Sequence, residues 1–402
     1  MTNPTRSLVF LLAAISLSFQ STACKKRSNQ DGGNEIVNSA DLKPVKNDWT
    51  FLWLSANPVT LNPVLKTDAS SSEIVSYLFD SLISFRSDTA EPEGRLAEKW
   101  EVSKDGLIYD FYLKKDLKFH DGKPITAEDV KFSFDITRDP KVDAAHLQNY
   151  YASLDQVEVM KSDHVRFKMK SVYYRNLIML GLRDIMPKHV YGKGDFNTLE
   201  ANRQPVGSGP YLLSKWENGR TIELQRWTDW WGTKDPLWKD RYNYNRIVFR
   251  IITEPNVALM ALKKGEIDGM EPTPAQWMND LSDPQIDKKF HKLTYETMDG
   301  NGYSYIGWNG KRPKFMDTKV RIALAHLMPR DEINKKIFGG MRKLAVGDAP
   351  RNSPKSDPTL QPILYDVEKA KTLLTEAGWK DSNNDGVIDK DGQKFVFELL
   401  LG

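Results

Sequence analysis

Residues Glu93–Thr137 read EGRLAEKWEVSKDGLIYDFYLKKDLKFHDGKPITAEDVKFSFDIT, and the rest of the fold is organised around this stretch. Trp100–Val102 and Leu107–Lys114 have the composition of two strands, and the turn-forming residues 104–106 (KDG) separate them. In the second strand apolar residues alternate with a mixed set, so one face of the strand is apolar. The pattern therefore predicts two strands joined by a tight turn.

A second turn and a helix follow these strands. His120–Pro124 (HDGKP) has the composition of a turn. Thr126 and Asp129 stand three residues apart, which is the spacing of a capping box at the start of a helix. The whole stretch thus predicts strand, turn, strand, tight loop and helix.

The order LAEKWEVSKDG, then YDFYLKKDLKFHDGKPITAEDVKFSF, resembles the signature of the family 5 extracellular solute-binding proteins. These are the substrate receptors of peptide and nickel importers driven by an ATP-binding cassette. Three more segments resemble the same family: Pro205–Tyr211 (PVGSGPY), Glu254–Met270 (EPNVALMALKKGEIDGM) and Tyr365–Trp379 (YDVEKAKTLLTEAGW). The resemblance implies an α/β fold with two lobes, similar to the type II, cluster C-like periplasmic binding proteins, and a small accessory β subdomain.

The resemblance also divides the chain into four segments. Residues 1–23 form a predicted signal peptide. Residues 24–47 are polar and rich in Asn, Ser and Gly, which predicts a flexible tether. Residues 48–271 would be the first lobe with its accessory subdomain, and residues 272–402 a portion of the second lobe. Because family members run on past this length, we expect the second lobe to be incomplete here.

Apolar spacing predicts the remaining elements. The predicted helices are Ser70–Ser84, Glu254–Lys264, Asp317–Leu327 and Asp366–Ala377. The predicted strands are Trp49–Leu54, a hairpin over Leu154–Met169, Trp216–Arg226, Arg246–Ile252, Glu266–Asp268, Tyr303–Asn309 and Lys394–Leu401. The glycines of PVGSGPY are expected to supply φ angles that other residues cannot hold in a rigid turn.

The first residues have the layout of a secretion signal. Arg6 precedes the apolar run Leu8–Phe19, which is too short to span a bilayer. Cys24 is the only cysteine, so no intrachain disulfide can form. Ser-Thr-Ala-Cys resembles a lipobox in which Cys24 is lipidated, although Ser21 stands where Leu is preferred. The alternative is ordinary signal-peptidase cleavage after Ala23, without lipidation. If Cys24 is lipidated, the protein is anchored in the cell envelope, facing the periplasm or the exterior.

Charge and aromatic content narrow the kinds of ligand. The net charge is +3, or +2 after removal of Arg6 with the signal, and the basic residues are interspersed with acids, which excludes a nucleic-acid footprint. The 11 Trp, 15 Tyr and 17 Phe residues favour a pocket lined in part by rings. The candidate ligand contacts are Tyr305, Trp308 and Asn309 near the expected hinge, and Tyr150 and Tyr151 in an aromatic loop. Core packing is the alternative role for each.

The motifs of common enzymes and metal sites are missing from the sequence. Gly-x-Ser-x-Gly, His-Glu-x-x-His and paired Cys-x-x-Cys do not occur. His120 and His189 fit structural roles. Asp381–Gly386 (DSNNDG) resembles the opening of a calcium loop, but Gly392 occupies the twelfth position, where a Glu is required, so a Gly/Asp turn is favoured. We expect no enzymatic activity, no cofactor and no metal.

The sequence therefore predicts a monomeric substrate-binding lipoprotein that captures a solute, in the first instance a peptide, for an ATP-binding cassette permease. Two alternatives come from other classes. A membrane-anchored hydrolase would turn its substrate over, whereas a receptor only binds. A solute-sensing or adhesion lipoprotein would lack neighbouring permease and ATPase genes.

Overall fold

The computed structural model describes residues 48–86, 91–282, 286, 290–293, 303–347 and 356–400. Its strands are β1 (Trp49–Leu54), β2 (Ile83–Phe85), β3 (Pro92–Gly94), β4 (Ala97–Val102), β5 (Ile108–Leu113), β6 (Leu154–Lys161), β7 (His164–Met169), β8 (Tyr211–Glu217), β9 (Thr221–Arg226), β10 (Arg246–Ile251), β11 (Asp389–Lys390) and β12 (Gln393–Lys394). Its α-helices are α1 (Ala69–Leu78), α2 (Ala127–Asp135), α3 (Ala145–Gln148), α4 (Asn176–Gly181), α5 (Lys188–Tyr191), α6 (Pro255–Lys264), α8 (Pro313–Met316), α9 (Thr318–His326), α10 (Arg330–Phe338) and α11 (Val367–Glu376).

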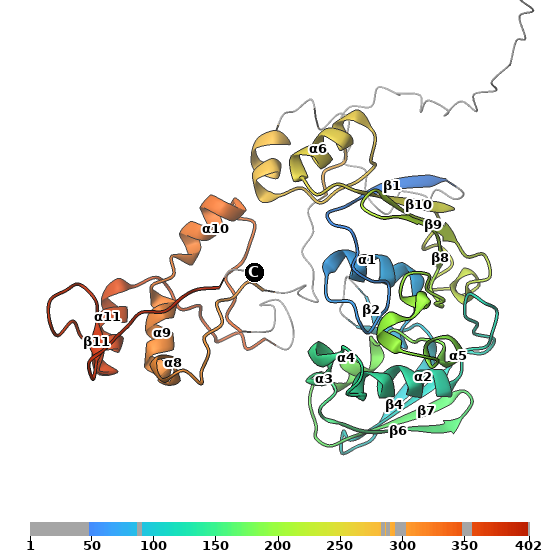
Figure 1. Ribbon diagram of the computed structural model, residues 1–402, viewed down its shortest axis with the longest axis horizontal. Coiled ribbons are helices and arrows are strands. Elements are labelled where there is room, and N and C mark those ends of the chain that lie inside the picture. The colour runs from blue at the N-terminus through green and yellow to red at the C-terminus, as the bar shows by residue number, and fades with distance from the viewer. Residues whose placement is uncertain are drawn as a thin grey trace, which may run out of the picture.

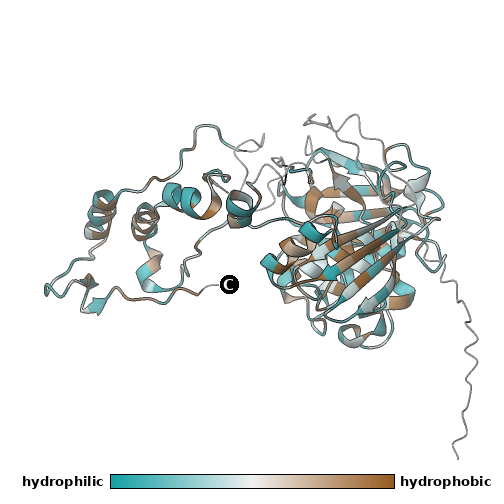
Figure 2. Cartoon of the chain, turned by 90° about the horizontal axis from the view of Figure 1, so that it is seen from above, coloured by the Kyte–Doolittle hydropathy of each residue, from teal (hydrophilic) through white to brown (hydrophobic). Residues whose placement is uncertain are grey.

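Two groups of elements are visible in Figure 1. The N-terminal body, residues 48–86 and 91–269, holds the strands β1–β10. The C-terminal region, residues 303–347 and 356–400, holds α8–α11 with β11 and β12. Figure 2 shows the hydrophobic strands gathered inside the N-terminal body.

The main sheet of the N-terminal body has the order β1-β10-β9-β8. β1 runs parallel to β10, and the other neighbours are antiparallel. Its core cluster includes Leu54, Ile74, Leu78, Ile222 and Phe249, which joins α1 to the sheet. The predicted strand at the position of β1 is confirmed. The single strand expected over 216–226 is instead two strands, because the chain turns between β8 and β9.

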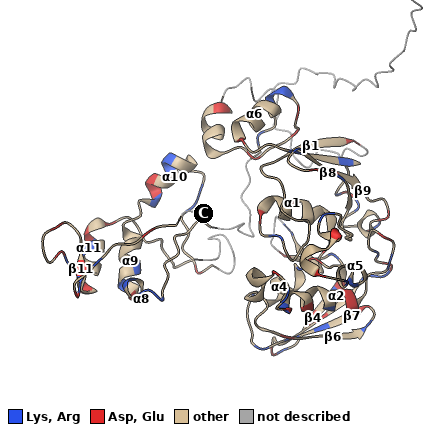
Figure 3. Cartoon of the chain, viewed as in Figure 1, with Lys and Arg blue, Asp and Glu red and all other residues tan. Residues whose placement is uncertain are grey.

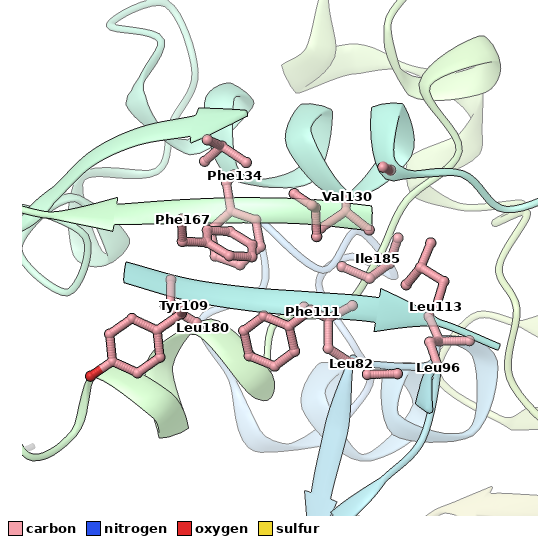
Figure 4. Close-up of a cluster of buried hydrophobic side chains, with 14 of the residues drawn as sticks. Leu82, Leu96, Tyr109, Phe111, Leu113, Val130, Phe134, Phe167, Leu180 and Ile185 are labelled. Atoms are coloured by element: carbon pink, nitrogen blue, oxygen red, sulfur yellow. The ribbon is translucent and has the colours of Figure 1, made fainter. Parts of the chain in front are cut away.

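The second sheet has the order β4-β5-β7-β6 and is antiparallel throughout. Figure 4 shows Phe111 and Leu113 of β5 and Phe167 of β7 meeting Val130 and Phe134 of α2. The alternation read in the sequence thus directs one face of β5 at a helix. The strand pairs β4–β5 and β6–β7 and the start of α2 are confirmed.

The predicted helix over 70–84 is too long, because α1 ends at Leu78 and the chain turns into extended backbone at Phe79 (φ −124°, ψ 147°). Ile83 then pairs with Gly94 in the β2–β3 ladder. The cause is Asp80, which is fully buried between these elements. Its carboxylate accepts hydrogen bonds from Arg95 and from the indole nitrogens of two tryptophans, which fixes the chain away from the helix axis.

The PVGSGPY segment packs directly on the end of α1. Its backbone nitrogens at Ser208 and Gly209 donate to Leu78 O over 3.0 and 2.9 Å. A Cβ added at Gly207 would lie 1.9 Å from Leu78 O. Neither Gly207 nor Gly209 has a positive φ, so the expectation that they supply unusual backbone angles is wrong. They are needed because two backbones touch there.

The C-terminal region is built on the pair α9 and α11, which confirms the two predicted helices. Asp317 and Asp366 cap them by accepting hydrogen bonds from Lys319 N and Lys369 N. Between the helices lies a core cluster of eight buried residues, Phe315, Val320, Ala323, Leu324, Ala370, Leu374, Ala377 and Trp379. Figure 3 shows α10 with acidic residues at its start and basic residues at its end, which complements the helix dipole.

Two predicted strands of the C-terminal region are not formed. Residues 303–309 have no strand pairing, and of the segment beginning at Lys394 only Gln393–Lys394 is paired, with Asp389–Lys390. A strand requires a hydrogen-bonded neighbour along its length, and the described residues provide none for residues 303–309 or 397–400. The apolar side chains still pack, since Phe397 contacts Phe315 with ring centroids 5.4 Å apart.

Candidate functional site

The chain leaves the N-terminal body alongside β1. α6 ends at Gly265, which has φ +75° and closes the helix as predicted. Asp268 N then donates to Phe51 O over 2.7 Å, and the Asp268 carboxylate accepts from Phe51 N over 2.8 Å. Gly269 forms an isolated parallel bridge with Leu52, which replaces the short strand predicted at 266–268. This anchoring fixes where the chain departs toward the C-terminal region.

Just beyond that bridge, Glu271 follows close enough to Glu73 for their two charges to interact. Glu73 lies on α1, and Glu271 follows two residues after Gly269. The pKa of Glu73 is raised because surrounding protein atoms remove part of its hydration and because the Glu271 charge repels its own. Both side chains reach the surface, and within the described residues neither forms an ion pair. Like charges placed this way favour a positively charged group beside them.

Tyr77 stands one helical turn beyond Glu73. Its ring packs on Tyr211, Tyr242 and Phe249 at centroid distances of 5.8, 6.4 and 5.7 Å. Burial, with a smaller contribution from the Glu73 charge, raises the pKa of Tyr77 to about 12. The phenol therefore stays protonated at neutral pH. Sequence reasoning misses this group, because Glu73 and Glu271 carry no motif and meet only in the fold.

The predicted contacts near the hinge occupy different surroundings. Tyr305 is 77% exposed, and its ring lies 5.6 Å from that of Tyr303. Trp308 packs on Phe315 at 5.1 Å, at the edge of the C-terminal core. The Asn309 side chain accepts a hydrogen bond from the backbone N–H two residues later over 3.0 Å. Tyr305 and Asn309 are exposed, and Trp308 is half-buried.

The predicted aromatic loop is also divided. Tyr150 is 60% exposed, whereas Tyr151 is buried with its ring 5.4 Å from Phe134. The Tyr151 hydroxyl donates to Met179 O over 3.4 Å. Adjacent residues in the sequence thus face opposite ways, one toward solvent and one into the core.

The DSNNDG loop forms a turn that is closed by hydrogen bonds from its backbone N–H groups to one of its own carboxylates. The Asp381 carboxylate accepts from Asp385 N over 3.1 Å and from Gly386 N over 2.9 Å. The Asp385 carboxylate pairs with Lys394 over 2.5 Å. These bonds match the Gly/Asp turn. Among the described residues, no group of three or more His, Cys, Asp or Glu side chains is placed to hold a metal ion.

Residues 1–47, and with them Cys24, lie outside the described portion of the chain. Among the described helices, none has the length and apolar character needed to cross a membrane.

Comparison with known proteins identifies the family. Residues 91–401 match the family described as bacterial extracellular solute-binding proteins, family 5 Middle. The oligopeptide-binding protein AppA of Bacillus subtilis is 32% identical, over 98% of this chain and 68% of the relative. This chain belongs to family 5 of the solute-binding proteins. The predicted family and the predicted two-lobed α/β fold are both confirmed.

Solved structures support the same assignment. The structure of AppA in complex with a nonapeptide superposes with a TM-score of 0.69 at 31% identity, covering 88% of this chain and 68% of that one. NikZ from Campylobacter jejuni in complex with Ni(L-His) also gives 0.69, at 27% identity, covering 87% and 67%. The dipeptide-binding protein of Escherichia coli is 28% identical over 80% of this chain and 62% of its own length. The chain spans 58–68% of the length of the curated relatives it matches.

Family membership also bears on catalysis and location. Family 5 proteins are receptors for transport rather than enzymes, and the relatives named above are binding proteins. The prediction of no enzymatic activity is therefore confirmed. The family acts outside the cytoplasm, as extracellular or periplasmic proteins.

Proposed function

We propose that this chain belongs to the solute-binding lipoprotein of an ATP-binding cassette importer and that the solute is a peptide. The observation that carries the proposal is the similarity to AppA over almost the whole chain. The E. coli relative is also a peptide-binding protein. NikZ was solved with a nickel–histidine complex, so the peptide assignment rests on the peptide-binding relatives rather than on the family as a whole.

We place the solute between the two lobes, with residues 48–271 on one side and residues 272–402 on the other. Tyr305 and Tyr150 are proposed as direct contacts, because exposed rings give contact area at low entropic cost. Trp308, Asn309 and Tyr151 are proposed to complete the site beside them, although each also packs or bonds locally. Ligand-driven closure of the lobes would then be the signal for a permease.

The carboxyl pair suits one end of a peptide. Glu73 and Glu271 lie where the chain passes out of the N-terminal body, and a peptide amino group or basic side chain would relieve their repulsion. This would give the site a preference for cationic over anionic peptides.

The remaining elements of the proposal concern the cell envelope. Removal of residues 1–23 and lipidation of Cys24 would leave a monomer tethered by residues 24–47. Mass spectrometry of the mature N-terminus tests this directly. An unmodified Cys24 on a released protein would contradict the anchor and favour cleavage by the ordinary peptidase.

The solute can be identified without prior choice. The protein is isolated from the membranes of its own host, denatured, and the released small molecules are analysed by mass spectrometry. We expect intact peptides in stoichiometric amount, and a subsequent peptide-library incubation should leave every peptide uncleaved. Release of a metal chelate or sugar would overturn the peptide assignment, whereas peptide cleavage that follows the protein through purification would favour a hydrolase.

A further inference from the structure

The two most distinctive motifs of the sequence meet through one histidine. His120 lies in the HDGKP turn between β5 and α2, and its ring faces the backbone of PVGSGPY. The Nδ1 atom accepts from Gly207 N over 3.1 Å, and Nε2 lies 3.0 Å from Gly209 O. His120 N also donates to Gly207 O over 2.8 Å. One residue thus ties the turn to both glycines.

These contacts fix the protonation state of the ring. An N–H donor at Gly207 requires an unprotonated Nδ1, and a carbonyl at Gly209 requires a proton on Nε2. Only the neutral imidazole with its hydrogen on Nε2 satisfies both. A second proton, on Nδ1, would point the N–H of the ring at the backbone N–H of Gly207, and the hydrogen bond between them would be lost. The ring of Trp227 packs nearly perpendicular to the imidazole, with the two centroids 4.9 Å apart.

The bond joins two cores of the N-terminal body. Phe119 and Ile125, on either side of the turn, belong to the core of the β4-β5-β7-β6 sheet. PVGSGPY leads into β8 of the main sheet, whose core includes Tyr211. His120 therefore links the main sheet to the β4-β5-β7-β6 sheet, which is the accessory sheet.

Burial and the neighbouring polar and charged groups shift the pKa of His120 in opposite directions. Burial is the largest influence and lowers the pKa of His120, while the hydrogen bond to Gly209 O and the carboxylates of Asp80 and Asp121 raise it. Both carboxylates already have partners: Asp80 binds Arg95, and Asp121 lies 2.6 Å from His189 Nε2 and 4.0 Å from Lys123 Nζ. The net result is a ring that stays neutral at neutral pH.

We propose that His120 is an acid-sensitive latch between the accessory sheet and the main sheet, and that its protonation releases Gly207 and loosens this junction. The direction follows from the linkage between protonation and folding. A histidine whose pKa is lowered by folding stabilises the fold fully above its unfolded value of about 6.5, and the contribution is lost as pH falls toward the folded value. The latch acts whether or not a solute is bound.

Hydrogen exchange at Gly207 tests the latch in the intact chain. After correction for intrinsic exchange, we expect protection of the segment 205–211 to fall between pH 7 and pH 5, by at most about tenfold per pH unit because one proton is taken up. His120→Gln, which cannot be protonated in this range, should show no such dependence, and His146→Gln, at an exposed site on α3, should behave as wild type. Equal slopes in wild type and His120→Gln would overturn the proposal.

A second measurement follows the tautomer of the His120 ring itself. The chain has six histidines, and nitrogen-15 spectra distinguish their tautomers. We expect one imidazole to keep its proton on Nε2 down to a pH below the midpoint of the exposed histidines. The buried His326 carries its hydrogen on Nδ1, which faces Leu364 O over 2.7 Å. His164 and His189 each face a carboxylate through Nε2, over 2.7 and 2.6 Å, so the resonance is assigned to His120 by its absence from the spectrum of His120→Gln. Absence of any neutral Nε2–H ring at pH 6 would also overturn the proposal.

Discussion

The N-terminal body and the C-terminal region differ in how their apolar residues are enclosed. In the N-terminal body two four-stranded sheets each carry helices, and the largest fully buried side chains, Trp238 and Phe111 among them, all lie there. In the C-terminal region a small cluster lies between α9 and α11, while Leu399 and Leu400 are exposed. The larger buried side chains therefore lie in the region whose strands are paired, and the helix pair encloses a smaller core.

The largest expected consequence of this difference is in protease sensitivity. Local opening costs little free energy where strands are unpaired and apolar contacts few. We expect a nonspecific protease at low concentration to cut the C-terminal region at least about a hundredfold faster than residues 91–269, a difference of ~3 kcal/mol in opening. Mass spectrometry of the fragments over time gives both rates. Equal resistance along the whole chain would show that the C-terminal region is as firmly closed as the sheets.

Replacing one core side chain by alanine in each region tests the same difference between the N-terminal body and the C-terminal region. Phe111 is fully buried and meets Phe167 edge to face at 5.6 Å, so Phe111→Ala should cost about 3–5 kcal/mol of unfolding free energy. Leu374 in α11 is at the margin of burial, so Leu374→Ala should cost about 2 kcal/mol, the low end for such changes. Urea unfolding followed by far-ultraviolet circular dichroism measures both. A Leu374→Ala effect as large as that of Phe111→Ala would contradict the difference between the two regions.

The features that could be predicted from the sequence are those set by neighbouring residues. The capping box at Thr126, the hairpins of the second sheet and the caps of α9 and α11 all depend on spacings of a few residues. The end of α1 could not be predicted in this way. It is determined by Asp80, whose partners Arg95, Trp230 and Trp231 come from other segments of the chain.

The candidate site shows the same limit. Composition indicates aromatic contacts, but it cannot separate exposed Tyr150 from buried Tyr151, since that depends on where Phe134 lies. The pair Glu73 and Glu271 has no local signature at all. Apolar alternation predicts strands at 303–309 and after Lys394, yet a strand also needs a partner.

Glycine substitutions test close packing in one region against open space in the other. Gly207→Ala places a methyl group on Leu78 O, so the backbone of the junction must move, at a cost of about 1–3 kcal/mol. Gly310 in the C-terminal region has no heavy atom within 4 Å of a built Cβ and no positive φ, which makes Gly310→Ala the matched control. Thermal unfolding should show a lower midpoint for Gly207→Ala and almost none of that shift for Gly310→Ala. A tolerated Gly207→Ala would mean that the α1 contact is looser than its geometry indicates.

The smallest expected effect lies at the passage between the two regions. The pKa of Glu73 is raised in the fold, so ionisation is unfavourable there, and stability present below the unfolded pKa of about 4.3 is lost as pH rises through the folded value. Glu73→Gln should therefore stabilise the chain at pH 7, by a few tenths of a kcal/mol because solvent screens these surface carboxylates. Glu73→Gln should have no effect on stability near pH 3. The control Glu98→Gln, on the exposed side of β4, should leave stability unchanged at both pH values.

A double-mutant cycle on Glu73 and Glu271 shows whether the two carboxylates repel each other or affect stability independently. Glu271→Gln alone should give a gain similar to that of Glu73→Gln, while the double variant should gain less than the sum, because either substitution already removes the repulsion. Added salt should shrink all three gains, since the groups are open to solvent. Unfolding free energies of the four proteins at pH 7, in low and high salt, complete the cycle. Strict additivity would show that Glu73 and Glu271 act independently, and the preference for a cationic group proposed for this position would lose its physical basis.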